Sequence, residues 1–123
     1  MSKADSQSIV EEINIFLQKE LWFDFEVICY QDRKLTIIGS IDPSSHHNIE
    51  IYFEDIFFVS LPVEWKTDTT KTILSILAGD NAIELNKRFQ VEIGYHIFRF
   101  APEDYPEDFG CLIGARKISY SLS

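Results

Sequence analysis

The chain has 123 residues, of which 46% are hydrophobic and 25% charged, and its formal net charge is −9. This length and composition are typical of one globular domain, so we expect a single domain spanning residues 1–123. An acidic surface repels phosphate backbones, which argues against nucleic-acid binding and favours a basic protein partner. Every apolar run is shorter than the roughly 20 residues that cross a bilayer, and the first residues do not resemble a signal peptide. We therefore expect a cytoplasmic protein that is not associated with a membrane.

An amphipathic helix is predicted for residues 6–19. Asp5 and Ser6 can cap its first turn, because their side chains accept hydrogen bonds from free backbone N–H groups. The apolar residues that follow form one stripe at helical spacing: Ile9, Val10, Ile13, Phe16 and Leu17. Such a helix is stable when it is docked, so we expect it to pack on one face of a sheet.

Two strands are predicted next, at residues 23–30 and 34–41, with a short turn at 31–33. Alternate residues of the first strand are apolar and should share one face, and Cys29 falls in that set with Phe23 and Phe25. The second cysteine, Cys111, also lies in an apolar run. We expect both thiols to be reduced and buried.

The central element is predicted in residues 48–65. Ile49, Ile51 and Phe53 alternate with polar residues, and residues 56–61 are apolar on both parities apart from one serine. A two-residue hairpin at Glu54-Asp55 would normally need Gly or Asn. One long strand bent by a bulge is therefore favoured, with a hairpin as the alternative.

The second half of the chain changes its pattern. Asp68 can cap a short middle helix that begins at Thr69 and ends near Gly79, and residues 80–87 can add another helical turn. A long strand at residues 89–100 with a kink near Gly94, a loop at 101–110 and a last strand at 111–121 follow. The whole order predicts an α+β domain. We expect a single twisted, mostly antiparallel sheet, with the N-terminal helix packed on one face and a short middle helix.

The loop at residues 102–109 is the most unusual segment, because it repeats a four-residue unit as P-E-D-Y-P-E-D-F. Proline stiffens a loop and lowers the entropy that it loses on binding. An aromatic anchor with an acidic rim would suit a basic partner. The candidate partner-binding residues are Glu103, Asp104, Tyr105, Glu107, Asp108 and Phe109. The alternative is a surface connection whose aromatic rings pack back onto the sheet.

Catalytic motifs are missing from the sequence, which contains no P-loop, no G-x-S-x-G and no dinucleotide-binding glycine pattern. We therefore expect a protein that is not an enzyme and that needs no cofactor or metal. His46 and His47 are adjacent, so in a strand they point to opposite faces and cannot easily hold one ion. The alternative function is a small-ligand-binding or enzymatic domain with its site near His46, His47 and Glu50.

Two strand segments together resemble a known family. F-D-F-E-V at residues 23–27 and I-E-I-Y-F-E-D-I at residues 49–56 are similar to the first and central strands of some small bacterial immunity proteins from polymorphic toxin systems. The resemblance implies a cytoplasmic protein that binds and neutralises one cognate toxin. Together with the charge and the acidic-aromatic loop, it favours a small acidic protein-interaction module, and specifically an immunity protein against a basic toxin domain.

Overall fold

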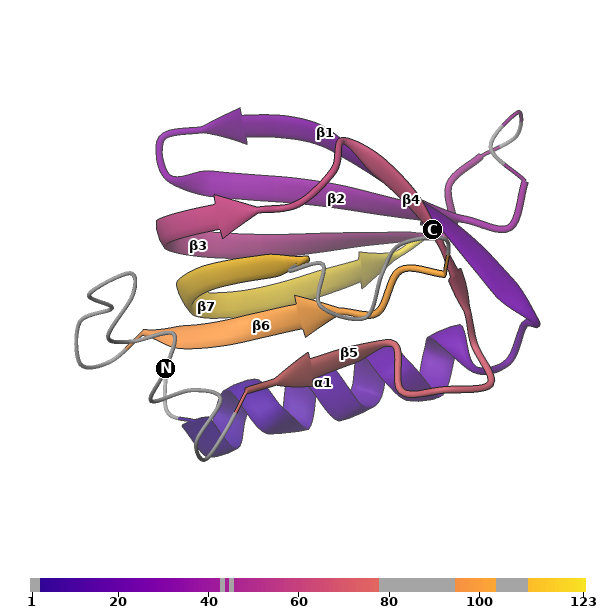
Figure 1. Ribbon diagram of the computed structural model, residues 1–123, viewed down its shortest axis with the longest axis horizontal. Coiled ribbons are helices and arrows are strands. Elements are labelled where there is room, and N and C mark those ends of the chain that lie inside the picture. Colours follow the sequence, from indigo (N-terminus) through magenta and orange to yellow (C-terminus); the bar gives the residue numbers. More distant parts are fainter. Residues whose placement is uncertain (1–2, 43, 45, 78–94, 104–110) are drawn as a thin grey trace.

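The computed structural model describes residues 3–42, 44, 46–77, 95–103 and 111–123. It is an α+β fold with one N-terminal helix and one curled antiparallel sheet (Figure 1). The described residues form seven strands in the order β4-β1-β2-β3-β7-β6-β5. Their bounds, after the helix α1 at Lys3–Leu17, are β1 Trp22–Gln31, β2 Lys34–Ser40, β3 Ile49–Ser60, β4 Glu64–Asp68, β5 Leu74–Ile76, β6 His96–Phe100 and β7 Leu112–Leu122.

The helix α1 follows the predicted apolar stripe. Val10, Ile13 and Leu17 are buried, and the helix contacts β5 and β7. The side-chain amide of Asn14 donates to the carbonyl oxygen of Leu74 at 2.8 Å and accepts from its N–H at 3.1 Å. It thus satisfies both backbone groups of one residue on an edge strand, where they would otherwise be open to another chain. The described helices include none that is long and apolar enough to cross a membrane.

At Glu54-Asp55 the central element is one continuous strand, as favoured over a hairpin, but this strand ends at Ser60, and Glu64 and Trp65 at the end of the predicted range begin the separate strand β4. Buried positions alternate up to Phe53, and the next buried residue is Ile56, three positions later. Asp55, between them, has a φ of 56°, and the register against β7 shifts between Ile56 and Phe58. Figure 1 shows β3 and β7 curving back together at the end of the molecule that carries the β1–β2 hairpin. The predicted bulge is therefore a sharp bend of the whole β3–β7 ladder.

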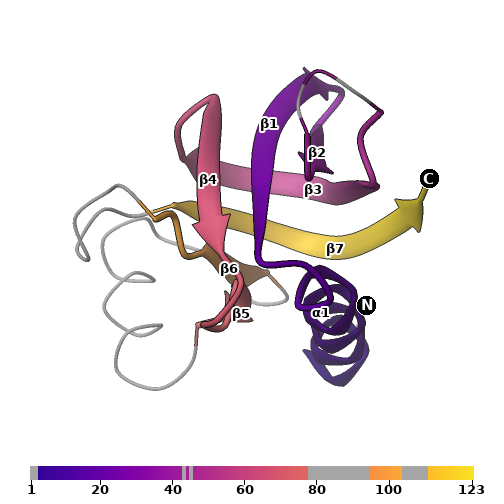
Figure 2. The same ribbon diagram turned by 90° about the vertical axis from the view of Figure 1, so that its right-hand side faces the viewer.

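The bend allows the sheet to enclose an aromatic core. In Figure 2, β1 and β4 run across β3 and β7. The ring centroids of Phe25 and Phe100 are 5.3 Å apart, those of Trp65 and Phe100 are 5.1 Å apart, and those of Phe53 and Phe98 are also 5.1 Å apart. These contacts join β6 to β1, β4 and β3, none of which is its neighbour in the sheet order, and each ring buries a large apolar area.

Hydrogen bonds also link β4 to the residues that follow β6. The hydroxyl of Thr67 donates to the carbonyl of Ala101 at 3.2 Å, and the N–H of Glu103 donates to the carbonyl of Lys66 at 2.8 Å. The edge strand β4 is therefore partly satisfied by the end of β6 rather than left open to another chain.

The predicted middle helix is not found in residues 69–77, which form a turn followed by β5. Asp68 does accept a hydrogen bond from the N–H of Thr70, at 2.9 Å, but this bond closes a turn instead of capping a helix. The hydroxyl of Thr69 bonds the carbonyl of Glu20, which ties the turn to the segment after α1. Tertiary contacts have overridden a weak helical pattern rich in β-branched residues. Residues 78–94, which include the predicted helical turn and the kink near Gly94, lie outside the described residues.

The two cysteines differ, contrary to the expectation that both are buried. The register of β1 against β2 shifts between Val27 and Cys29, so a bulge reverses the alternation. Cys29 is consequently exposed, whereas Cys111 is buried. Both are free thiols. Burial raises the pKa of the Cys111 thiol to about 12, which keeps it protonated at neutral pH.

A thiol reagent should therefore modify the native protein at Cys29 alone, because the thiolate is the reactive form and must also be accessible. Mass spectrometry of the native and the urea-unfolded protein would count the modified residues. We expect one modified thiol per native chain and two per unfolded chain. The Cys29→Ser variant should remain unmodified when it is native. Equal reaction rates at the two cysteines in the native protein would contradict this description.

Candidate functional site

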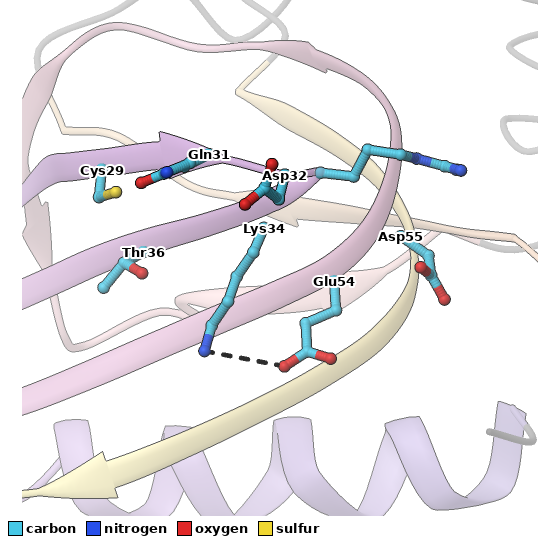
Figure 3. A pocket seen from close by; sticks show the side chains of 8 residues that line it. Cys29, Gln31, Asp32, Lys34, Thr36, Glu54 and Asp55 are labelled. Carbon is cyan, nitrogen blue, oxygen red and sulfur yellow. Dashed lines mark ion pairs between the residues drawn. The ribbon is translucent and has the colours of Figure 1, made fainter.

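An open hollow of about 540 Å³ lies at the end of the β1–β2 hairpin (Figure 3). It is formed by the last residues of β1, the hairpin turn, the first residues of β2 and the bend of β3. Its walls are mostly polar and carry both signs of charge. The lining residues are Cys29, Gln31, Asp32, Arg33, Lys34, Thr36, Glu54 and Asp55.

Unusual backbone geometry gathers at this hollow. Asp32 and Arg33 form the two-residue turn between β1 and β2, with φ values of 54° and 62°. Two positive values suit the twist of a tight hairpin, although glycine is the usual residue there. Among the described residues other than glycine, one more has a positive φ. It is Asp55, at the bend of β3. Such conformations cost energy and are often retained at functional sites, which makes this region a candidate site.

The charges of the hollow are only loosely paired. The ammonium of Lys34 lies 3.9 Å from a carboxylate oxygen of Glu54 (Figure 3). It also lies 4.7 Å from the ring centroid of Tyr52. Both partners of the ion pair are substantially exposed, so the pair contributes little to stability. The lining includes the thiol of Cys29 but no histidine that could act as its base.

A row of carboxylates crosses the outer face of the same sheet. Glu64 of β4 lies opposite Glu26 of β1, which lies opposite Ile38 of β2, which in turn lies opposite Glu50 of β3. We call Glu64, Glu26 and Glu50 the acidic row. Glu64 and Glu26 are exposed and Glu50 is half-buried. Their strand neighbours on the opposite face are buried in the core, including Trp65, Phe25, Ile37 and Ile51.

Like charges in directly opposed positions are unfavourable in a sheet. Cβ atoms of opposed residues are about 5 Å apart, so the carboxylates of Glu26 and Glu64 repel each other. Nothing in the folding of the two strands requires this pair, because both side chains face solvent. The arrangement therefore costs some stability, and it places two negative charges side by side on the outer face.

The predicted partner-binding loop can be placed only at its first residue. Glu103 is exposed and bonds to β4 through its backbone N–H. It also borders a second open hollow of about 310 Å³, whose lining is Leu21, Trp22, Lys66, Asp68, Thr70 and Glu103. The other five candidates, Asp104, Tyr105, Glu107, Asp108 and Phe109, lie outside the described residues. The loop thus starts beside β4, the strand that carries Glu64 of the acidic row.

Of the residues predicted for the alternative site, His47 and Glu50 lie close together and His46 does not join them in a recorded contact. A ring nitrogen of His47 lies 3.6 Å from a carboxylate oxygen of Glu50, whose other oxygen accepts from the hydroxyl of Tyr52 at 2.8 Å. His46 is exposed. The two hollows are lined by other residues. Across the described part of the chain, no group of three or more His, Cys, Asp or Glu side chains could hold a metal ion.

Sequence reasoning missed the hollow and the acidic row for different reasons. The hollow had a local signal, since a two-residue turn with the sequence Asp-Arg lacks the glycine that such turns favour. The acidic row had none, because its members come from three strands and are aligned only by the register.

Comparison with known proteins adds no family to this description. A scan against protein-family models, a search of the curated proteins and a search of the solved structures each found no match to the chain. Its function is therefore inferred from its own residues.

Proposed function

We propose that this chain is a protein-interaction module that binds a basic protein through the outer face of β4, β1, β2 and β3. The observation that carries the proposal is the acidic row, in which the exposed carboxylates of Glu26 and Glu64 are directly opposed. Lys or Arg side chains of a partner would relieve their repulsion on binding. Complementary charge of this kind accelerates association and selects the partner.

Apolar side chains beside the row supply the other half of an interface. Ile28, two residues after Glu26, is 49% exposed, and Val63, adjacent to Glu64, is 69% exposed. The N–H of Val27 donates to the carbonyl of Val63 at 2.8 Å, which holds these two segments side by side. Stable interfaces commonly combine apolar contacts with a charged rim. The same region therefore offers contact area as well as charge.

We further propose that the partner is a basic toxin domain and that this chain neutralises it in the bacterial cytoplasm without catalysis. The support is the resemblance of two segments to immunity proteins. Those segments lie in β1 and β3 and contain Glu26 and Glu50 of the acidic row. The loop at residues 102–109 would extend this surface from the edge strand β4.

The double variant Glu26→Gln/Glu64→Gln tests the acidic row. The chain, immobilised, would be used to capture partners from the source cell at low salt, and mass spectrometry would identify them. We expect a protein of net positive charge whose association rate with the variant is about tenfold slower at low salt, because the row steers the encounter. The difference should disappear at high salt. Stability should stay constant or rise by a few tenths of a kcal/mol, because a like-charge pair is removed.

Glu11→Gln/Glu20→Gln, at two exposed positions outside the acidic row, removes the same number of charges and is the matched control. It should leave the association rate close to that of the unmodified chain. The proposal fails if no protein is retained at low salt, or if the control slows association as much as the double variant.

The aromatic anchor of the loop can be tested separately with Tyr105→Ala. If Tyr105 is buried by the partner, its truncation should weaken binding by about 2 kcal/mol, as for other aromatic hot spots. The thermal unfolding temperature should hardly change. Replacing Glu103, Asp104, Glu107 and Asp108 by their amides should mainly slow association. A loss of stability in Tyr105→Ala, with unchanged association in the amide variant, would instead show that the loop packs on its own sheet.

A further inference from the structure

Two arginines from distant parts of the chain converge on one tyrosine. Arg33 lies in the β1–β2 turn, Arg116 lies in β7, and Tyr95 directly precedes β6. A terminal nitrogen of Arg33 donates to the hydroxyl oxygen of Tyr95 at 2.6 Å. The guanidinium of Arg116 lies 4.8 Å from the centroid of the Tyr95 ring. We call these three residues the Arg33–Tyr95–Arg116 cluster.

The cluster is held in place by the bend of β3. The carbonyl of Arg33 accepts from the N–H of Ile56 at 3.2 Å, and Nε of Arg33 donates back to the carbonyl of Ile56 at 3.3 Å. The ring of Phe57 lies 5.5 Å from that of Tyr95, centroid to centroid. Arg33 occupies a left-handed position that glycine would adopt at lower cost. The hydrogen bonds that its guanidinium donates to Ile56 and Tyr95 offset part of the cost of placing arginine at this turn position.

The cluster keeps several hydrogen-bond donors that these contacts do not use. A guanidinium has five N–H donors, and the two bonds of Arg33 use one on Nε and one on Nη2. Arg116 meets Tyr95 through the ring face, so this contact takes up none of its donors. Tyr95 accepts from Arg33 and so retains its own O–H for donation. Among the described residues, no carboxylate lies within 4 Å of either guanidinium, although Asp32 and Asp55 are close in the sequence.

We propose that the Arg33–Tyr95–Arg116 cluster binds an oxyanion, the phosphate or carboxylate group of a small molecule. Guanidinium groups bind both oxyanions through paired, charge-assisted N–H bonds, and a tyrosine hydroxyl can add a further donor. The site is local, since the net charge of −9 repels anions over most of the surface. It is separate from the acidic row and does not depend on the proposed function.

The test is a titration of the full chain with inorganic phosphate and, in a second arm, with acetate, both at constant ionic strength set with NaCl. Side-chain NMR signals of arginine and tyrosine, and the thermal unfolding temperature, report binding. We expect saturable shifts and a rise in unfolding temperature, since a ligand that binds only the folded chain stabilises it. Saturation by phosphate alone identifies a phosphate-containing ligand as the source, and saturation by acetate as well extends the site to carboxylates.

Three variants assign the site. Arg33→Gln and Arg116→Gln should each weaken binding about tenfold, because each removes charge-assisted bonds. Tyr95→Phe should weaken it several-fold while retaining the aromatic ring. Lys117→Gln, at the exposed residue next to Arg116, is the matched control and should change affinity less than twofold. If Arg33→Gln does not fold, Arg116→Gln and Tyr95→Phe decide. Shifts that do not saturate with either anion, or an equal loss in Lys117→Gln, overturn the proposal.

Discussion

The bend of the β3–β7 ladder at Asp55 is the constraint on which the rest of the structure depends. The step from Phe53 to Ile56 interrupts the two-residue alternation, and Asp55 adopts the left-handed backbone that this change requires. An unbent β3 would carry β6 and β5 away from β1 and β4. The bend instead brings Phe100 of β6 against Phe25 and Trp65, so that the two ends of one sheet share an aromatic core.

The same bend organises the surface. Ile56, the first residue after it, exchanges two hydrogen bonds with Arg33 and so fixes the tip of the β1–β2 hairpin. The hollow, the Arg33–Tyr95–Arg116 cluster and the left-handed residues therefore lie together because they share one support. The acidic row lies farther along the same strands, where the pairing is regular and each glutamate is held on the outer face. A rigid sheet can present charges in a defined pattern without a preformed cavity.

Local periodicity was a good guide wherever it was strong. The apolar stripe of α1 and the alternation in β1, β2 and β3 predicted elements that the structure contains, and the missing glycine at Glu54-Asp55 correctly favoured a bent strand. The prediction failed at Thr69, where a capping residue serves a turn, and at Cys29, where a bulge reverses the alternation. The acidic row and the Arg33–Tyr95–Arg116 cluster could not be predicted from the sequence, because strand register and the curl of the sheet bring their members together from separate segments.

The role of Asp55 in bending the β3–β7 ladder is tested most directly by comparing the free energies of unfolding of Asp55→Gly and Asp55→Val. Glycine accepts a positive φ without cost, so Asp55→Gly should be at least as stable as the unmodified chain. Valine is β-branched and strongly disfavours that conformation, so Asp55→Val should lose about 1–3 kcal/mol. If valine is tolerated as well as glycine, the left-handed residue is not what bends the ladder, and the proposed basis of the closed core is wrong.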